Sequence, residues 1–396
     1  MNDLPANLDA FLITRGGPFY ELQKRLRLLH EHNLNVRRRA MLFVALAWGG
    51  PLVLSLLEGH AWGGWDEHPF LLELAVWARF VVAMGIFVLM EPHVEGRLRT
   101  ILHQFSEAKM LGAASYRLAA EAVSRALDRQ NAFWPELVCV LLAYTISLGG
   151  AWLRLRNGTM ATGWMATDVD GAVQLTLAGW WCFLISNPLF IFLLFRWFWR
   201  MQVWSWLLAS LAQLDLRLVA THPDGLGGLG FVVRYPNAYT MLVFAVSCVL
   251  GSALMHVFLD HGVSMQAYGI VIGGWLLLVV GLFTYPLLAF WRPLARLRKQ
   301  TLLLAGAKST THLRHAERQV LGRNVCADDP SYEQQLEGNA DATASFVAAT
   351  KLSTLLIRRS ELIPISLAAS VPLILAGASQ WPLKELAAIL KKLVLL

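Results

Sequence analysis

Six long apolar runs dominate this chain, and they restrict it to a lipid bilayer. Each run is close to the roughly 20 residues that a helix needs to cross about 30 Å of hydrocarbon. The runs are about residues 40–57, 69–90, 134–153, 175–197, 238–259 and 268–291. Over all 396 residues, 56% are hydrophobic and 15% are charged, a balance that water-soluble domains do not have. The pattern predicts an all-α, polytopic helical membrane protein.

Lysine and arginine are concentrated in alternate loops. The rich loops, which hold 28 of these residues, are 1–40, 92–133, 196–237 and 292–361. The loops between them, which hold two, are 58–68, 154–173 and 261–268. This positive-inside bias predicts a cytoplasmic N-terminus in a bacterial-type inner (plasma) membrane. It also accounts for the net charge of +7, so we expect a lipid bilayer rather than nucleic acid as partner.

The apolar and polar stretches divide the chain into four parts. Residues 1–39 form a cytoplasmic segment in which Phe19, Leu22 and Leu26 share one face of an amphipathic helix predicted over 18–33. Residues 40–291 form a six-helix transmembrane domain. A cytoplasmic helical hairpin over 292–360 and a C-terminal membrane part over 361–396 follow.

The C-terminal part has two interpretations. Ile363 to Ser379 is apolar but short, and Pro364 and Pro372 disfavour a straight helix. The amphipathic residues Trp381 to Leu396 favour the cytoplasmic leaflet, which requires a re-entrant segment before them. The alternative is a seventh span with an external tail.

Arg79 is a charged residue inside the second apolar run, about nine residues from its start. An arginine at the centre of a membrane helix costs at least about 2.5 kcal/mol and normally faces protein or water. Glu73 lies six positions earlier, on roughly the opposite face, so polar atoms of the fourth run are the better partner. Arg79 is either an anion or gating site in a water-filled path or a structural clamp between helices.

Ser186-Asn187-Pro188 interrupts the fourth run. Pro188 removes one backbone donor, and the Asn187 amide can bridge the gap or contact a ligand. A broken helix at this depth is where transporters place ion and substrate sites. The alternative is a simple proline kink.

The loop Thr221 to Phe231 combines charged side chains with an unusual number of glycines. His222 and Asp224 flank a proline, and the glycines that follow are Gly225, Gly227, Gly228 and Gly230. The spacing G-x-G-x-x-G indicates dinucleotide binding only between a strand and a helix, and here it lies between membrane spans. The loop is either a ligand or gating loop at the cytoplasmic mouth or a tight connection into the next span.

We therefore expect an ion channel or small-solute transporter, forming homo-oligomers, with Arg79, Glu73, Asn187 and Pro188 along the path of an ion or small solute. A second hypothesis is a membrane-anchored signalling or assembly protein whose cytoplasmic hairpin recruits a partner. An intramembrane enzyme is the third, although the sequence shows no nucleophile with a nearby base. No spacing matches a metal site, and no cofactor is indicated.

Overall fold

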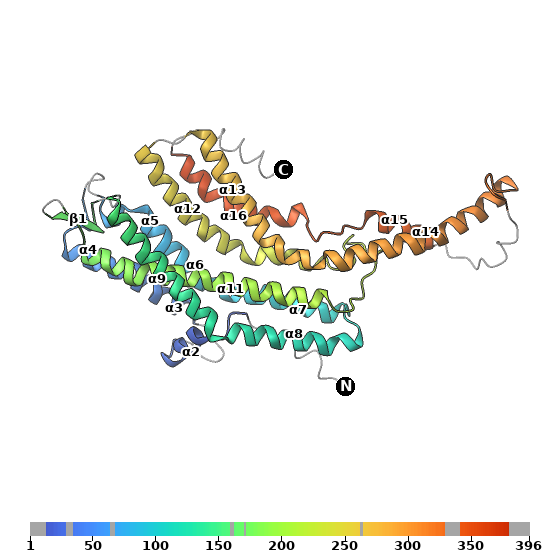
Figure 1. The fold of residues 1–396 in the computed structure, drawn as a ribbon, viewed down its shortest axis with the longest axis horizontal. Helices are drawn as coiled ribbons and strands as arrows, with labels where there is room; N and C mark the ends of the chain where they lie inside the picture. The colour runs from blue at the N-terminus through green and yellow to red at the C-terminus, as the bar shows by residue number, and fades with distance from the viewer. Residues whose placement is uncertain are drawn as a thin grey trace.

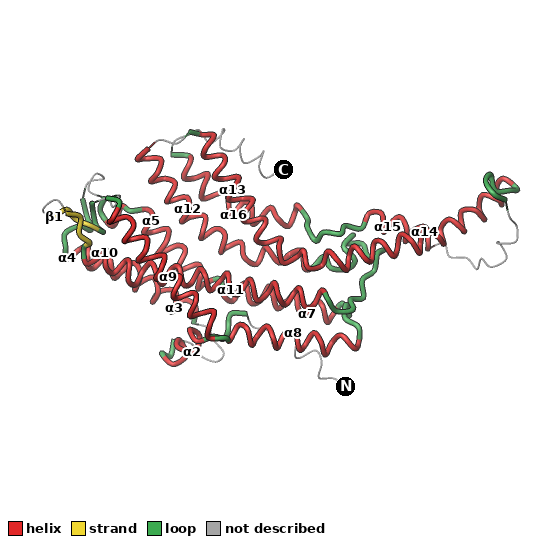
Figure 2. Tube along the Cα trace, in the orientation of Figure 1, coloured by secondary structure: helices red, strands yellow, loops and turns green. Residues whose placement is uncertain are grey.

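A computed structural model describes residues 13–28, 35–63, 68–158, 162–169, 172–261, 264–328 and 341–379. The described chain is almost entirely helical (Figures 1 and 2), and seven of its helices are long and apolar enough to cross a membrane. They are Val36–Leu57, Leu74–Glu107, Phe133–Arg156, Leu177–Ala212, Val232–Met255, Met265–Leu321 and Arg359–Gly377. The prediction of an all-α polytopic membrane protein is confirmed.

Three of the seven helices contain a wider, π-helical turn. The first consists of α3 (Val36–Val44), the π turn Ala45–Gly49 and α4 (Gly50–Leu57). In the second, α5 (Leu74–Val76) leads into the π turn Trp77–Ala83 and then α6 (Met84–Leu89) and α7 (Glu91–Glu107). The fourth consists of α10 (Leu177–Trp181), the π turn Cys182–Ser186 and α11 (Asn187–Ala212).

The sixth helix runs far beyond the membrane-crossing bundle. It begins as α13 (Met265–Thr284), passes through a 3₁₀ turn (Tyr285–Phe290) and continues as α14 (Trp291–Leu321), so the expected boundary at residue 291 falls inside one helix (Figure 1). The short helix α15 (Asp341–Lys351) packs along α14, with Ser309 Oγ 3.0 Å from Thr343 Oγ1. This pair is the predicted hairpin, but its second helix ends at Lys351, and an irregular stretch over 352–358 follows.

The C-terminal apolar segment is a single helix, α16 (Arg359–Gly377), despite its two prolines. It packs against α12 (Thr240–His261) and α13 (Figure 1). Glycines allow the close approach: a Cβ on Gly251 would lie 3.0 Å from the Pro372 carbonyl oxygen, and one on Gly377 would lie 2.6 Å from the Tyr268 ring. A continuous 19-residue helix that is long and apolar enough to cross a membrane agrees with the seventh-span alternative. The expected amphipathic tail, 381–396, lies outside the described residues.

The N-terminal helix differs from its prediction. The described helix, α2, covers only Pro18–Arg25, and residues 29–34 lie outside the described part. Phe19 does not share an outward face with Leu22. It packs inward between Phe43 of α3 and Phe192 of α11, with ring centroids 6.0 and 4.9 Å away.

The remaining elements connect the long helices. Helix α8 (Ala113–Asn131) precedes α9 (Phe133–Arg156), and a 3₁₀ segment (Val232–Tyr239) leads into α12. Two short antiparallel strands, β1 (Ala166–Val169) and β2 (Ala172–Leu175), were not expected from the sequence. They are yellow in Figure 2 and lie at the end of the bundle farthest from α14.

Candidate functional site

The three π turns come together inside the bundle. The turn Ala45–Gly49 contacts both Trp77–Ala83 and Cys182–Ser186. A π turn disturbs the regular ladder of backbone hydrogen bonds, so some carbonyl oxygens need other partners. In hydrocarbon those partners must come from the protein itself.

Side chains of neighbouring helices supply the missing donors. Ser186 Oγ donates to the Ala47 carbonyl oxygen at 2.7 Å, and Trp181 Nε1 donates to the Leu46 carbonyl oxygen at 3.0 Å. Ser147 of α9 donates to the Phe183 carbonyl oxygen, also at 2.7 Å. The π turns Ala45–Gly49 and Cys182–Ser186 are therefore fastened to each other, and the latter also to α9, by polar contacts inside an apolar bundle.

Arg79 lies in the second π turn and binds Asn187 of the fourth membrane helix. Its Nη1 donates to Asn187 Oδ1 at 3.0 Å, while Asn187 Nδ2 lies 3.5 Å from Cys182 Sγ. Because α5 begins at Leu74, Arg79 is closer to the helix start than the sequence suggested. The fourth helix is not broken at Pro188: a π turn precedes Asn187, and α11 continues through the proline.

The charge on Arg79 faces a neutral amide. Asn187 is 8% exposed, whereas Arg79 is half-buried. Glu73, at the start of α5, attracts the guanidinium from a distance, and Arg154 of α9 repels it. The structure thus brings Arg79 and Asn187 into contact, with Pro188 buried beside them and Glu73 one and a half turns away. The guanidinium also lies over the rings of Phe80 and Phe190, 5.9 and 6.0 Å from their centroids. A partly exposed guanidinium is chemically suited to hold an anion.

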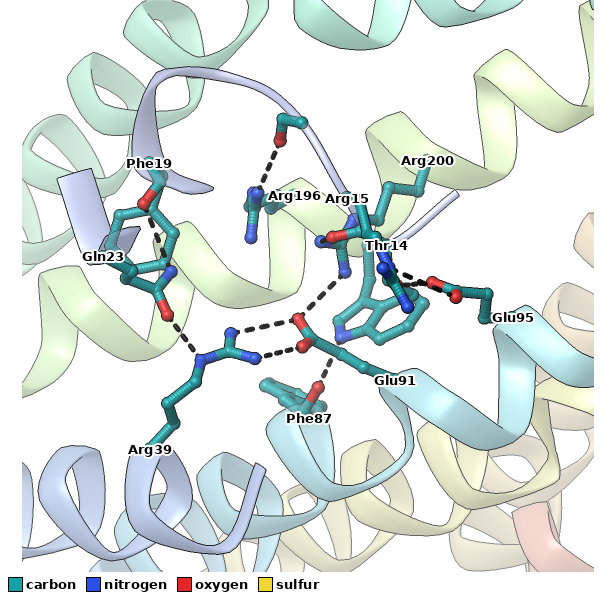
Figure 3. A network of polar contacts seen from close by, with 12 residues as sticks. Thr14, Arg15, Phe19, Gln23, Arg39, Phe87, Glu91, Glu95, Arg196 and Arg200 are labelled. Atoms are coloured by element: carbon teal, nitrogen blue, oxygen red, sulfur yellow. Dashed lines mark hydrogen bonds and ion pairs between the residues drawn. The ribbon is translucent and has the colours of Figure 1, made fainter. Parts of the chain in front are cut away.

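A second polar cluster lies where α2 meets α3, α7 and α11 (Figure 3). The Glu91 carboxylate accepts from Arg39 Nη1 at 2.5 Å and from Arg200 Nη1 at 3.3 Å. Arg39 Nε also donates to Gln23 Oε1 at 2.5 Å. The side chains of Arg39, Arg200 and Glu91 are between 2% and 4% exposed, so each charge depends on its partners.

The same cluster fixes the N-terminal segment. Glu136 of α9 accepts from Arg196 Nε at 2.8 Å and from the Phe19 backbone N–H at 2.6 Å. Arg196 donates to the Gly16 carbonyl oxygen at 3.1 Å, and Arg200 donates to the Thr14 carbonyl oxygen at 2.9 Å (Figure 3). Residues 13–19 therefore lie across the helix ends as a strap, and we use that name below.

Sequence reasoning missed this charged cluster. Its members are Arg39, Glu91, Glu136, Arg196 and Arg200. Each lies at the end of an apolar run on the side rich in Lys and Arg, so the sequence predicts a solvated residue at the membrane boundary. The available signal was that Glu91 and Glu136 are acidic residues directly at such boundaries.

The glycine-rich loop is organised around Asp224. Its Oδ1 accepts from the backbone N–H groups of Leu226 and Gly228 at 2.8 and 3.1 Å, and its Oδ2 accepts from that of Gly230 at 2.9 Å. His222 Nδ1 lies 2.9 Å from the same carboxylate. The positive φ angles of 63°, 68° and 96° at Gly225, Gly227 and Gly228 explain why glycine stands at these positions.

The loop connects three distant parts of the chain. A Cβ on Gly227 would meet Leu294 of α14 at 3.2 Å, and one on Gly228 would meet Met110, between α7 and α8, at 3.2 Å. The stretch before α16 binds the loop as well: the Ser353 N–H donates to the Gly225 carbonyl oxygen at 3.0 Å, and Arg358 donates to that of Asp224. Both carboxylate oxygens of Asp224 are already engaged, so its first role is to hold the loop in shape.

Removing the Glu91 charge tests the charged cluster. Glu91→Gln leaves the buried guanidiniums of Arg39 and Arg200 without their carboxylate, which we expect to cost about 3–5 kcal/mol. Denaturant unfolding of the purified protein in detergent measures this loss. The control is Glu121→Gln, which removes a 55%-exposed partner of Arg117 on α8 and is expected to cost less than about 1 kcal/mol. Equal, small losses for both variants would contradict a role of the cluster in stability.

The Asp224 loop predicts a dependence of stability on pH. Burial alone would raise the pKa of Asp224, but hydrogen bonds from Leu226, Gly230, Gly228 and His222 outweigh it and lower the pKa. The charged form then stabilises the fold above the ordinary pKa of about 3.9, and this stability is lost as the pH falls through the lowered pKa.

Asp224→Asn should therefore be less stable than wild type at pH 7, by about 1–3 kcal/mol, and the difference should shrink below pH 4. Thermal unfolding followed by tryptophan fluorescence at both pH values measures it. Asp128→Asn, on the exposed face of α8, is the matched control. A difference that stays constant between pH 7 and pH 3 would show that the carboxylate charge is not the stabilising feature.

Comparisons with known proteins identify no relative. No protein-family model, no curated protein and no solved structure matches this chain. Among the residues that the structure describes, no three His, Cys, Asp or Glu side chains gather as metal ligands would. The function is therefore inferred from the polar sites inside the bundle.

Proposed function

We propose that this protein is an ion channel or small-solute transporter, with Arg79 and Asn187 lining the path. The observation that carries the proposal is the half-buried guanidinium of Arg79, which lies in a membrane-crossing helix and binds a neutral amide. Such a charge is costly unless protein, water or a passing ion compensates it. Asn187 supplies one hydrogen bond, so the remaining guanidinium donors are suited to an anion or to water in the path.

The three π turns support a role in conduction. A π turn holds one residue more than an α turn, so its conversion would rotate the rest of the helix by about 100°. Arg79 sits in one of these turns, and Asn187 directly follows another. A change in either turn would separate the two side chains and alter the path. We place Glu73, at the start of the same helix, at the outer mouth.

The membrane orientation follows from charge. The loops that hold most of the lysines and arginines all lie at one side of the seven-helix arrangement, and we assign that side to the cytoplasm of a bacterial-type inner membrane. The N-terminus, the α14–α15 hairpin and the His222 to Gly230 loop then face the cytoplasm. We place this loop at the inner mouth, where it couples the hairpin to α16.

A flux assay on reconstituted protein tests the proposal. Vesicles that contain wild-type protein should release chloride or potassium faster than protein-free vesicles, as measured with ion-selective electrodes. Arg79→Leu should change the rate or the anion selectivity by at least about tenfold, because it removes the charge that binds Asn187 Oδ1. The control is Arg292→Leu, which removes an exposed arginine at the start of α14 and should leave flux unchanged.

Two outcomes would contradict the proposal. One is that wild-type protein carries no chloride, potassium or glycerol, although its thermal midpoint shows that it is folded. The other is unchanged flux and selectivity in folded Arg79→Leu.

The α14–α15 hairpin favours a second candidate function, a membrane-anchored assembly protein. Outside the membrane, α14 exposes large apolar side chains, among them Leu303 at 65% and Val320 at 82%. A shallow cavity of about 460 Å³ also lies between α14 and α15, lined in part by Leu297 and Lys308. Absence of flux together with specific capture of a partner by the full-length chain would favour this function.

A further inference from the structure

The outward surface of α2 and of the first turns of α3 combines exposed aliphatic and cationic side chains. On α2 and the residue after it, Leu22 and Leu26 are 51% and 60% exposed. They lie one helical turn apart and therefore point the same way. The exposed cations of this surface are Lys24, Arg25, Arg27, Arg37 and Arg38, and its exposed acid is Glu21. We call these residues the α2–α3 surface.

Two inward contacts fix the level of this surface along the bundle. Phe19 of α2 packs on Phe43 of α3, and Gln23 binds Arg39. The first turns of α2 therefore lie beside the first turns of a membrane-crossing helix. At the same level, α3 itself exposes Met41 at 63%, a side chain that faces lipid in a membrane helix. The edge of the hydrocarbon must run close to Leu22 and Leu26.

We propose that the α2–α3 surface binds anionic phospholipids of the bilayer. Leu22 and Leu26 enter the acyl boundary, while the guanidiniums of Arg25, Arg27, Arg37 and Arg38 contact phosphate and other anionic headgroup oxygens. Aliphatic residues beside several cations are the two features that hold a helix in an anionic membrane surface. The proposal is independent of what passes Arg79.

The opposite face of α2 connects this surface to the charged cluster. Gln23 accepts from Arg39, which binds Glu91, and the Phe19 N–H donates to Glu136. The Arg196 guanidinium also lies over the Phe19 ring, 5.0 Å from its centroid. Lipid that holds α2 at the membrane therefore also holds the strap over Arg196 and Arg200, so lipid composition can be sensed at the helix ends.

Competition between two lipids with the same acyl chains tests the proposal. Purified full-length protein receives an equimolar mixture of phosphatidylglycerol and phosphatidylcholine, and native mass spectrometry measures the ratio of bound lipids. Wild type should retain the anionic lipid in excess. The variant with Arg25, Arg27, Arg37 and Arg38 changed to Gln should lose most of this preference, at about fivefold per charge removed for headgroups in direct contact.

A variant with the same loss of charge elsewhere is the matched control. Arg117, Arg125, Arg314 and Arg323 are exposed on α8 and at the hairpin, and changing all four to Gln should leave the lipid ratio unchanged. Both variants must keep the wild-type thermal midpoint, and single substitutions of Arg25 and Arg27 replace the fourfold variant if it does not fold. The proposal is overturned if the α2–α3 variant retains the wild-type ratio, or if the control loses as much preference.

Discussion

The structure depends on the rule that backbone polar groups inside a membrane must find partners within the protein. A regular helix satisfies this rule with its own backbone hydrogen bonds, but three helices of this chain contain π turns that need partners from outside the turn. Carbonyl oxygens in and beside these turns accept hydrogen bonds from side chains of other helices. The donors are Ser186, Trp181 and Ser147, and the acceptors are the carbonyl oxygens of Ala47, Leu46 and Phe183. Keeping these turns demands side chains from two helices, the third and the fourth. These contacts gather at one place, next to the guanidinium of Arg79, which is why the proposed path is placed there.

Buried guanidinium charge is compensated differently at two places in the bundle. At the helix ends, Arg39 and Arg200 share the Glu91 carboxylate, and Arg196 binds Glu136. Backbone carbonyl oxygens of the strap accept further hydrogen bonds from Arg196 and Arg200. Deeper in the bundle, Arg79 donates a hydrogen bond to an amide oxygen. Among the described residues, no carboxylate lies within ion-pair distance of it. In the first arrangement each guanidinium faces a carboxylate, whereas in the second the guanidinium faces a neutral amide.

The sequence predicted what is local and periodic. Lengths of apolar runs and the bias of Lys and Arg indicated the membrane class, and the cost of a lone arginine directed attention to polar atoms of the fourth run, where Asn187 lies. The π turns were not predictable, because a single extra residue in a turn leaves no periodic trace in so apolar a run. The charged cluster joins residues up to 186 positions apart, as between Thr14 and Arg200, and no spacing rule links such pairs. Similarly, α13, the 3₁₀ turn and α14 follow one another without a break, so a boundary drawn from the change in polarity fell inside one helical stretch.

We propose that water and ions reach Arg79 inside the membrane, and cysteine accessibility tests this directly. In a background with all four native cysteines replaced, Arg79→Cys is treated in sealed vesicles with an anionic, membrane-impermeant thiosulfonate. Leu277→Cys, at a 76%-exposed position on α13 that faces lipid, is the control. We expect the reagent to modify Arg79→Cys at least about tenfold faster than Leu277→Cys, since a water-filled path both allows the thiol to ionise and admits the reagent. Equal, slow modification of both positions would contradict it.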